Sequence, residues 1–158
     1  MTSRTAAPVV VLIGPPGAGK SAVGPLLADR LGVEFRDTDA DVGAAAGKPV
    51  SDIFVEDGEH ATVLGLGSGA VLDPGIQQSL QGLPVVYLAA DFSTVAHRTG
   101  LDRPRVVIPG NPRGRLRAML EERRPLYERL AAVTVETDDY DPEELAEQIA
   151  ATLTEDPL

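Results

Sequence analysis

The stretch GPPGAGKS at residues 14–21 decides the fold of this chain. It matches G-x-x-x-x-G-K-[ST], a phosphate-binding loop in which glycines let successive backbone N–H groups face one anion. Before it, PVVVLI at 8–13 has the composition of a strand buried on both faces. After it, residues 20–31 follow a helical pattern, and Gly32 is a suitable helix stop. Strand, loop and helix therefore occur in the order that a phosphate loop requires.

The motif also assigns chemistry to its residues. The start of the helix presents the positive end of its dipole to phosphate groups. Lys20 supplies a mobile positive charge for the β- and γ-phosphates, and Ser21 offers its hydroxyl to Mg²⁺. The residues expected to bind ATP in this segment are Gly17, Ala18, Gly19, Lys20, Ser21 and Ala22.

Strands and helices alternate along the rest of the chain. Asp73 with Pro74, and Asp141 with Pro142, are good helix starts. Further strands are expected at 33–35, 62–66, 84–88 and 132–136, and further helices at 40–46, 50–57, 74–80, 91–99, 113–131 and 142–153. This alternation predicts a three-layer α/β/α fold with a parallel sheet, of the P-loop NTPase type. Residues 1–158 form one domain, and the Pro- and Arg-rich segment 101–113 is expected to be a mobile lid.

Composition narrows the class of partner. The net charge is -10, which disfavours nucleic acids and membrane surfaces as partners. No apolar run is long enough for a membrane span, and cysteine is absent, so we expect a cytoplasmic monomer that binds a small molecule. Most of the basic residues lie between Arg98 and Arg129, which fits either an anionic ligand or a solvated helix face.

Two carboxylates follow the second expected strand, in DTD at 37–39. The carboxyl ends of parallel strands face the same crevice as the phosphate loop. Asp37 and Asp39 suit two different roles there: one carboxylate holds the water shell of a metal ion, and the other binds a substrate hydroxyl or accepts its proton. A D-x-D pattern alone is equally compatible with a helix cap.

Motifs along almost the whole chain resemble the shikimate kinase family. Besides the phosphate loop and DTD, they include the pattern around GKPVSDIF…GE and the R-x-P-L-Y stretch. The matching segments are GKPVSDIFVEDGE at 47–59, GLGSGAVL at 65–72, VVYL at 85–88, HRTG with RPR at 97–105, and ERRPLYERLA at 122–131.

This resemblance implies a kinase that transfers a phosphoryl group from ATP to shikimate, with Mg²⁺ as cofactor. It implies that Lys20, Asp39 and Arg103 are catalytic, with Arg103 carried on the lid. Arg98 would lie near the nucleotide, and Ser21 and Asp37 would serve the metal. The implied substrate-binding residues are Asp39, Ser68, Gly69 and Arg123, the last of which would bind the substrate carboxylate.

Three departures from the family pattern stand out. The family follows the GE pair with F-R-x-x-E on a further helix, whose arginine is a second carboxylate ligand, but here His60 and Ala61 lead directly into TVLGLG. Ser68 replaces the middle glycine of a GGG sequence. An arginine that often lies beside the adenine is missing, with Tyr140 near its place.

Other functions remain open at this stage. The shortened segment leaves open a degenerate nucleotide-binding relative that has lost its substrate, and a kinase for another small metabolite such as gluconate is a further alternative. A dinucleotide-binding oxidoreductase is a third reading, because GLGSGA at 65–70 satisfies G-x-G-x-x-[GA] after a strand. In that fingerprint the third small residue lies in the first turn of a helix, whereas here the next helix starts only at Asp73 and Pro74.

Overall fold

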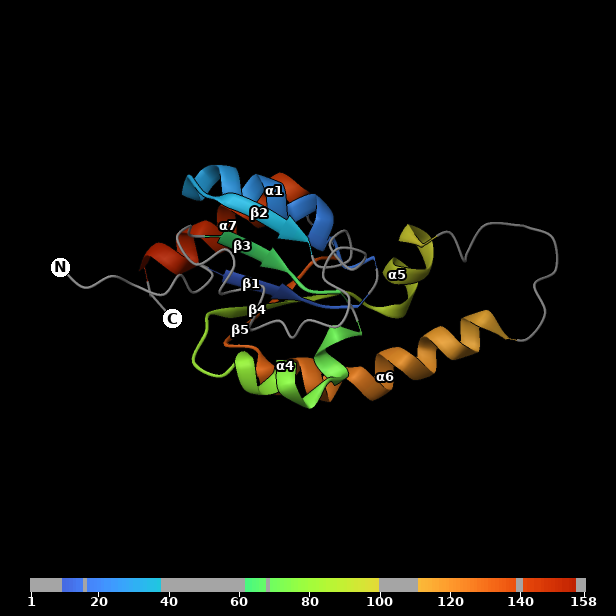
Figure 1. Cartoon of the computed structure of the whole chain (residues 1–158). Coiled ribbons are helices and arrows are strands. Elements are labelled where there is room, and N and C mark those ends of the chain that lie inside the picture. The colour runs from blue at the N-terminus through green and yellow to red at the C-terminus, as the bar shows by residue number, and fades with distance from the viewer. Residues whose placement is uncertain are drawn as a thin grey trace.

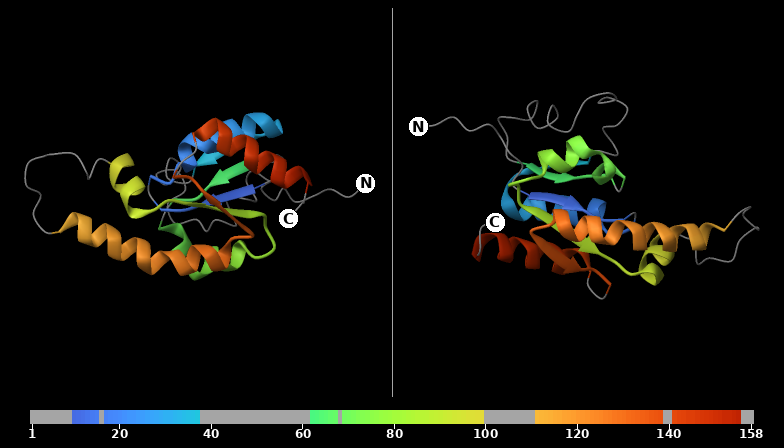
Figure 2. Two further views of the ribbon diagram at one scale, coloured as in Figure 1. Left: turned by 180° about the vertical axis from the view of Figure 1, so that it is seen from behind. Right: turned by 90° about the horizontal axis from the view of Figure 1, so that it is seen from below.

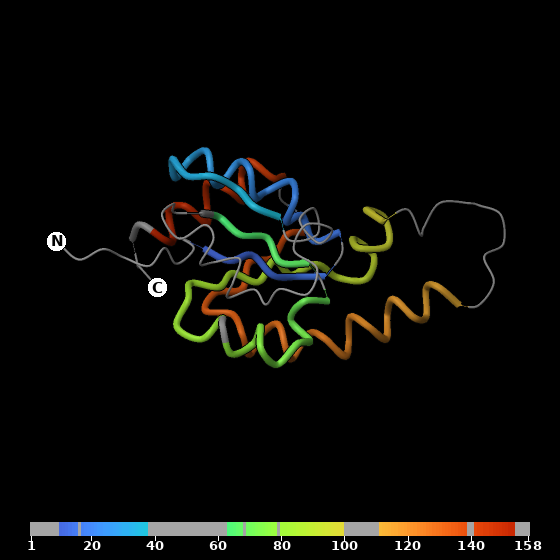
Figure 3. Tube along the Cα trace, viewed as in Figure 1, coloured from blue at the N-terminus to red at the C-terminus, as the bar shows by residue number. Residues whose placement is uncertain are grey.

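Five parallel strands form the centre of the molecule in the computed structural model, which describes residues 10–15, 17–37, 62–67, 69–99, 111–138 and 141–155. The strand order is β2-β3-β1-β4-β5. The strands are β1 (Val10–Ile13), β2 (Glu34–Asp37), β3 (Thr62–Gly65), β4 (Val85–Ala89) and β5 (Val133–Glu136). The tube in Figure 3 shows them side by side, all ending on the same edge. The predicted fold class is confirmed.

Helices cover both faces of this sheet. The described helices are α1 (Lys20–Leu31), the 3₁₀ helix η1 (Ala70–Leu72), α4 (Pro74–Ser79), α5 (Phe92–Arg98), α6 (Pro112–Leu130) and α7 (Pro142–Glu155). α1 and α7 pack together on one face, and α4 and α6 lie on the other (Figures 1 and 2). The result is the three-layer arrangement that alternating strands and helices predict.

β1 shows why the sheet needs both layers. All four of its residues are buried, and they alternate between the two faces. Val10 and Leu12 pack in the core under α1 and α7, whereas Val11 and Ile13 pack in the core under α4 and α6. A strand that is apolar on both faces is stable only in the middle of such a sandwich.

Local signals fixed most helix ends. Gly32 ends α1 in the left-handed conformation, with φ of 71°. The Asp73 carboxylate accepts a hydrogen bond from the Gly75 N–H at 2.7 Å and starts α4. Asp91 caps α5 in the same way, through the Thr94 N–H at 2.9 Å.

Some expectations need correction. α6 begins at Pro112, so residues 112 and 113 belong to this helix and not to the lid. α7 runs to Glu155, two residues beyond the expected end. η1 was not expected. The helices expected at 40–46 and 50–57, and lid residues 101–110, lie outside the described residues.

The fold also bears on the dinucleotide fingerprint and on membrane spans. Gly65 ends β3, and the short 3₁₀ helix η1 follows it, so GLGSGA lacks the α-helix that a dinucleotide fingerprint opens. None of the helices in the described part of the chain is both long and apolar enough to cross a membrane.

Candidate active site

The phosphate loop joins β1 to α1 in a conformation that requires its glycines. Gly14, Gly17 and Gly19 have φ of 155°, 79° and 107°, values that other residues rarely adopt. A side chain at Gly14 would also meet the Leu88 carbonyl oxygen at 2.6 Å. The loop therefore passes too close to β4 to carry side chains there.

The start of α1 suits an anion. Gly19 is the N-cap residue, no side chain caps the helix, and its first turn contains no acidic residue. The positive end of the helix dipole is therefore left for a negatively charged group. Ala22 lies exposed in this first turn, and its N–H donates to the Gly19 carbonyl at 3.1 Å.

Lys20 lies folded over the loop. Its Nζ donates hydrogen bonds to the Gly14 carbonyl at 2.7 Å and the Pro15 carbonyl at 3.1 Å. These neutral carbonyls are weaker partners for an ammonium group than a phosphate is. The lysine is thus held within the loop, where a phosphate would attract it.

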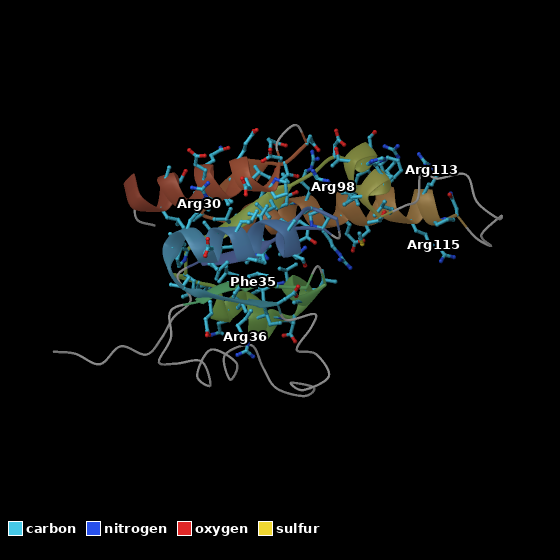
Figure 4. The ribbon with its side chains drawn as sticks, turned by 90° about the horizontal axis from the view of Figure 1, so that it is seen from above. Arg30, Phe35, Arg36, Arg98, Arg113 and Arg115 are labelled. Carbon is cyan, nitrogen blue, oxygen red and sulfur yellow. The ribbon has the colours of Figure 1, made fainter. Side chains whose placement is uncertain are left out.

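Ser21 and Asp37 come together from different elements. The Ser21 hydroxyl, in α1, donates to the Asp37 carboxylate, at the end of β2, at 2.9 Å. The Phe35 ring in β2 packs against Gly24 of α1, where a Cβ would overlap it, and this close approach brings the two elements together (Figure 4).

The donor set of this pair fits Mg²⁺. The described residues contain no group of three or more His, Cys, Asp or Glu side chains suited to a metal. Mg²⁺ usually takes one or two protein oxygen ligands and fills its remaining positions with water and phosphate oxygens. Ser21 and Asp37 can supply such oxygens beside the loop.

Arg98 lies at the end of α5, against the loop (Figure 4). Its guanidinium group donates to the carbonyl oxygens of Gly17 at 3.0 Å and Ala18 at 3.2 Å, and it also hydrogen-bonds Thr137. The structure thus puts Arg98 next to the phosphate loop, with hydrogen bonds to the protein itself.

Gly69 and Arg123 are brought together at the other side of the sheet edge. A Cβ at Gly69 would lie 4.0 Å from Nη2 of Arg123. Gly69 is the N-cap of η1, and Arg123 lies in the middle of α6. Two residues far apart in the sequence, both expected to bind substrate, are therefore neighbours in the fold.

The Tyr127 hydroxyl contacts the Arg123 guanidinium group. Burial raises the pKa of the Tyr127 hydroxyl, while a hydrogen bond from the Arg123 guanidinium opposes the rise. The ring is 1% exposed and stacks on Tyr87 of β4, with centroids 5.1 Å apart. Burial likewise raises the pKa of Tyr87, and nearby Arg124 opposes that rise.

Sequence reasoning missed this tyrosine pair. Besides Tyr127, α6 packs on the core through Leu116, which is buried, and through Leu120, Leu126 and Leu130, which are partly buried. The available signal was the spacing of Arg123 and Tyr127 in R-x-P-L-Y, since residues four apart share one face of a helix.

Three expected site residues cannot be located in this way. Asp39, Ser68 and Arg103 lie outside the described residues. The residues that are described form three groups: the phosphate loop with Lys20, the pair Ser21 and Asp37, and the pair Gly69 and Arg123. A site with these groups can bind a phosphorylated ligand, a divalent cation and a second, anionic molecule.

Comparisons with known proteins identify the family of this chain. A family model described as "Shikimate kinase" matches residues 16–62 and 59–154. A shikimate kinase of Thermobifida fusca is 49% identical, with 97% of each chain covered. One of Salinispora arenicola is 47% identical over 93% of this chain and 98% of the relative. Among solved structures, shikimate kinase from Acinetobacter baumannii in complex with shikimate has a TM-score of 0.77 at 32% identity, covering 96% of each chain.

The same comparisons place a break in the alignment. The family model matches in two parts that overlap at residues 59–62, starting at the Glu of the GE pair. The alignment with the Thermobifida fusca protein spans 170 positions, more than the 158 residues of this chain. The break coincides with the point where F-R-x-x-E is missing from the sequence.

Proposed function

This chain belongs to the shikimate kinase family, and we propose that its three residue groups divide the transfer of a phosphoryl group from ATP to a hydroxyl of shikimate between them. It is a small-molecule kinase of the P-loop type. The observation that carries the substrate half of the proposal is the position of Arg123 beside Gly69. A guanidinium group can bind a carboxylate through two parallel hydrogen bonds.

The phosphate loop and Lys20 bind the triphosphate. Lys20 exchanges the carbonyls of Gly14 and Pro15 for phosphate oxygens, which accept stronger, charge-assisted hydrogen bonds. Ser21 and Asp37, whose oxygens lie side by side, are the residues that would hold Mg²⁺. When bound, the metal neutralises charge that develops on the phosphates.

Transfer to the substrate also needs a group that takes the proton of the attacking hydroxyl, and residues that hold the substrate in place. Asp39, two residues beyond Asp37, is the expected acceptor for the proton of the attacking hydroxyl. Arg103 of the lid neutralises phosphate charge, and lid closure excludes the water that would otherwise compete for the phosphoryl group. The chain acts as a monomer in the cytoplasm, where it meets small-molecule substrates rather than nucleic acid or membrane.

One specific observation favours a second candidate function. Where the two parts of the family match overlap, the sequence lacks the F-R-x-x-E segment, which by the resemblance would carry a second arginine for the carboxylate. Loss of one partner in a charge-assisted pair costs about 2–5 kcal/mol. A chain with this loss could retain nucleotide binding while phosphorylating shikimate poorly, or act on another small acid.

A coupled assay of ADP release distinguishes these functions. The assay contains ATP, Mg²⁺ and either shikimate, gluconate or no acceptor, and intact mass confirms that the chain is the 16.6 kDa protein. We expect ADP only with shikimate. Asp39→Asn should lower kcat by about 10²–10⁴-fold while leaving ATP binding unchanged. ATP binding without ADP release from the wild type would identify the degenerate binding protein.

A further inference from the structure

The guanidinium group of Arg98 joins three segments that are distant in the sequence. Its Nη1 donates to the carbonyl oxygens of Gly17 at 3.0 Å and Ala18 at 3.2 Å, in the phosphate loop. The same Nη1 donates to the Thr137 hydroxyl oxygen at 3.2 Å, and Nη2 donates to the Thr137 carbonyl at 2.9 Å. The loop is thereby tied to the residue that follows β5.

Thr137 is itself fixed. It is 0% exposed, and apart from the tyrosines no other polar side chain in the described part of the chain is buried. Its N–H and its hydroxyl both donate to the carbonyl of Ala89, at the end of β4, at 2.9 and 3.0 Å. Because the hydroxyl proton is directed to Ala89, a lone pair of the oxygen remains to accept from Arg98. A chain of hydrogen bonds thus runs from β4 to the loop.

This chain of bonds bears on how the loop presents its N–H groups. In a planar trans peptide, the carbonyl oxygen and the following N–H point in opposite directions. Holding the Ala18 carbonyl against Arg98 therefore directs the Gly19 N–H to the other side. Gly17 and Gly19, at φ of 79° and 107°, have no Cβ to restrict peptide rotation, so an external restraint has a large effect here.

We propose that Arg98 and Thr137 are positioning residues, which preorganise the phosphate loop before the nucleotide binds. This inference rests on the proposed function, since it requires that the loop bind ATP. Fully buried Thr137 cannot touch the nucleotide, so any effect of its hydroxyl must pass through neighbours. A preorganised site binds more tightly because less conformational freedom is lost on binding.

The test measures binding of Mg-ATP and of inorganic tripolyphosphate by calorimetry. Thr137→Val removes the hydroxyl at nearly constant volume and should weaken both ligands by the same factor, about fivefold for one lost hydrogen bond. The KM for shikimate should not change. Thr134→Val makes the same change at an exposed position of β5 and should leave both affinities unchanged.

A double-mutant cycle measures whether the effect of Thr137 on ligand affinity depends on Arg98, which a general effect on the fold would not do. In the Arg98→Ala background, Thr137→Val should cause no further loss of affinity, and Thr137→Ser should restore the wild-type value where Arg98 is present. Arg98 is exposed, so its replacement tests the proposal even if Thr137→Val folds poorly.

Three results would overturn the inference. Equal losses from Thr137→Val in both backgrounds would mean that Thr137 acts on the fold. If Arg98→Ala weakened binding of Mg-ATP but not of tripolyphosphate, Arg98 would act on the adenine base and not on the phosphate loop. Wild-type affinity in Thr137→Val would remove the link altogether, whereas failure of the wild type to bind ATP would refute the proposed function together with this inference.

Discussion

The two sides of the site are built differently. On the nucleotide side, the phosphate loop leads directly into α1, and hydrogen bonds at 2.7–3.2 Å join Lys20, Ser21 and Arg98 to the loop carbonyls or to Asp37. On the substrate side, Gly69 and Arg123 meet only because η1 and α6 pack over the same sheet face. A local motif secures the first side, and tertiary packing secures the second.

This difference bears on how each side tolerates change. The nucleotide side needs only β1, α1 and their close neighbours, so the break at residues 59–62 leaves its described contacts intact. The substrate side draws on several separate segments, and one of these segments is shortened. Changes on the nucleotide side should therefore act mainly on kcat, and changes on the substrate side mainly on the KM for shikimate.

The largest effect is expected from Lys20→Ala, on the nucleotide side. Lys20 is the positive charge that the phosphate-loop motif assigns to the β- and γ-phosphates, and its removal leaves charge in the transition state without this donor. We expect kcat to fall by about 10²–10³-fold or more. ADP release at saturating shikimate measures kcat. The control is Arg30→Ala, at the exposed end of α1. Near-normal turnover would contradict the role of the loop.

On the substrate side, Arg123→Lys should act on KM. Lysine keeps the charge but loses the planar pair of donors that matches a carboxylate. We expect the KM for shikimate to rise about 10–100-fold, corresponding to roughly 1.4–2.8 kcal/mol, with the KM for ATP unchanged. The matched control is Arg124→Lys, the next residue on α6, which lies near Tyr87. Equal changes in both variants would exclude a specific role for Arg123.

The same contrast explains what the sequence could predict. The order of the described strands and helices and the helix starts at Asp73 and Asp141 follow from short-range signals, and these are confirmed. The Ser21–Asp37 pair follows from the rule that parallel strands end at one edge.

What the sequence did not predict depends on packing between elements. The Tyr87–Tyr127 stack joins β4 to α6, and the Arg98–Thr137 link joins α5 to the residue after β5. No local pattern marks either pair. The start of α6 at Pro112 was misjudged because Asn111 and Pro112 look like a loop, although Asn111 caps the helix through the Gly114 N–H at 3.0 Å.

A change that leaves all catalytic groups in place tests the link between α1 and β2. Gly24→Ala would put a methyl group into the Phe35 ring, and we expect the free energy of unfolding to fall by about 1–3 kcal/mol. Thermal unfolding measures the loss, and Phe35→Leu in the same chain should restore part of it by making room. An unchanged melting temperature would mean that the close approach of α1 to β2 is not required.

The smallest effect is expected from Tyr127→Phe. This change keeps the stack on Tyr87 and removes only the hydroxyl that accepts a hydrogen bond from Arg123. Loss of one such bond is worth about 1 kcal/mol, so the KM for shikimate should rise about threefold to tenfold while the KM for ATP stays constant. Tyr87→Phe removes the hydroxyl beside Arg124 instead and should leave both constants unchanged. If Tyr127→Phe lowered only the melting temperature, the tyrosine would serve the core of α6 and not the orientation of Arg123, and the substrate side would depend on packing alone.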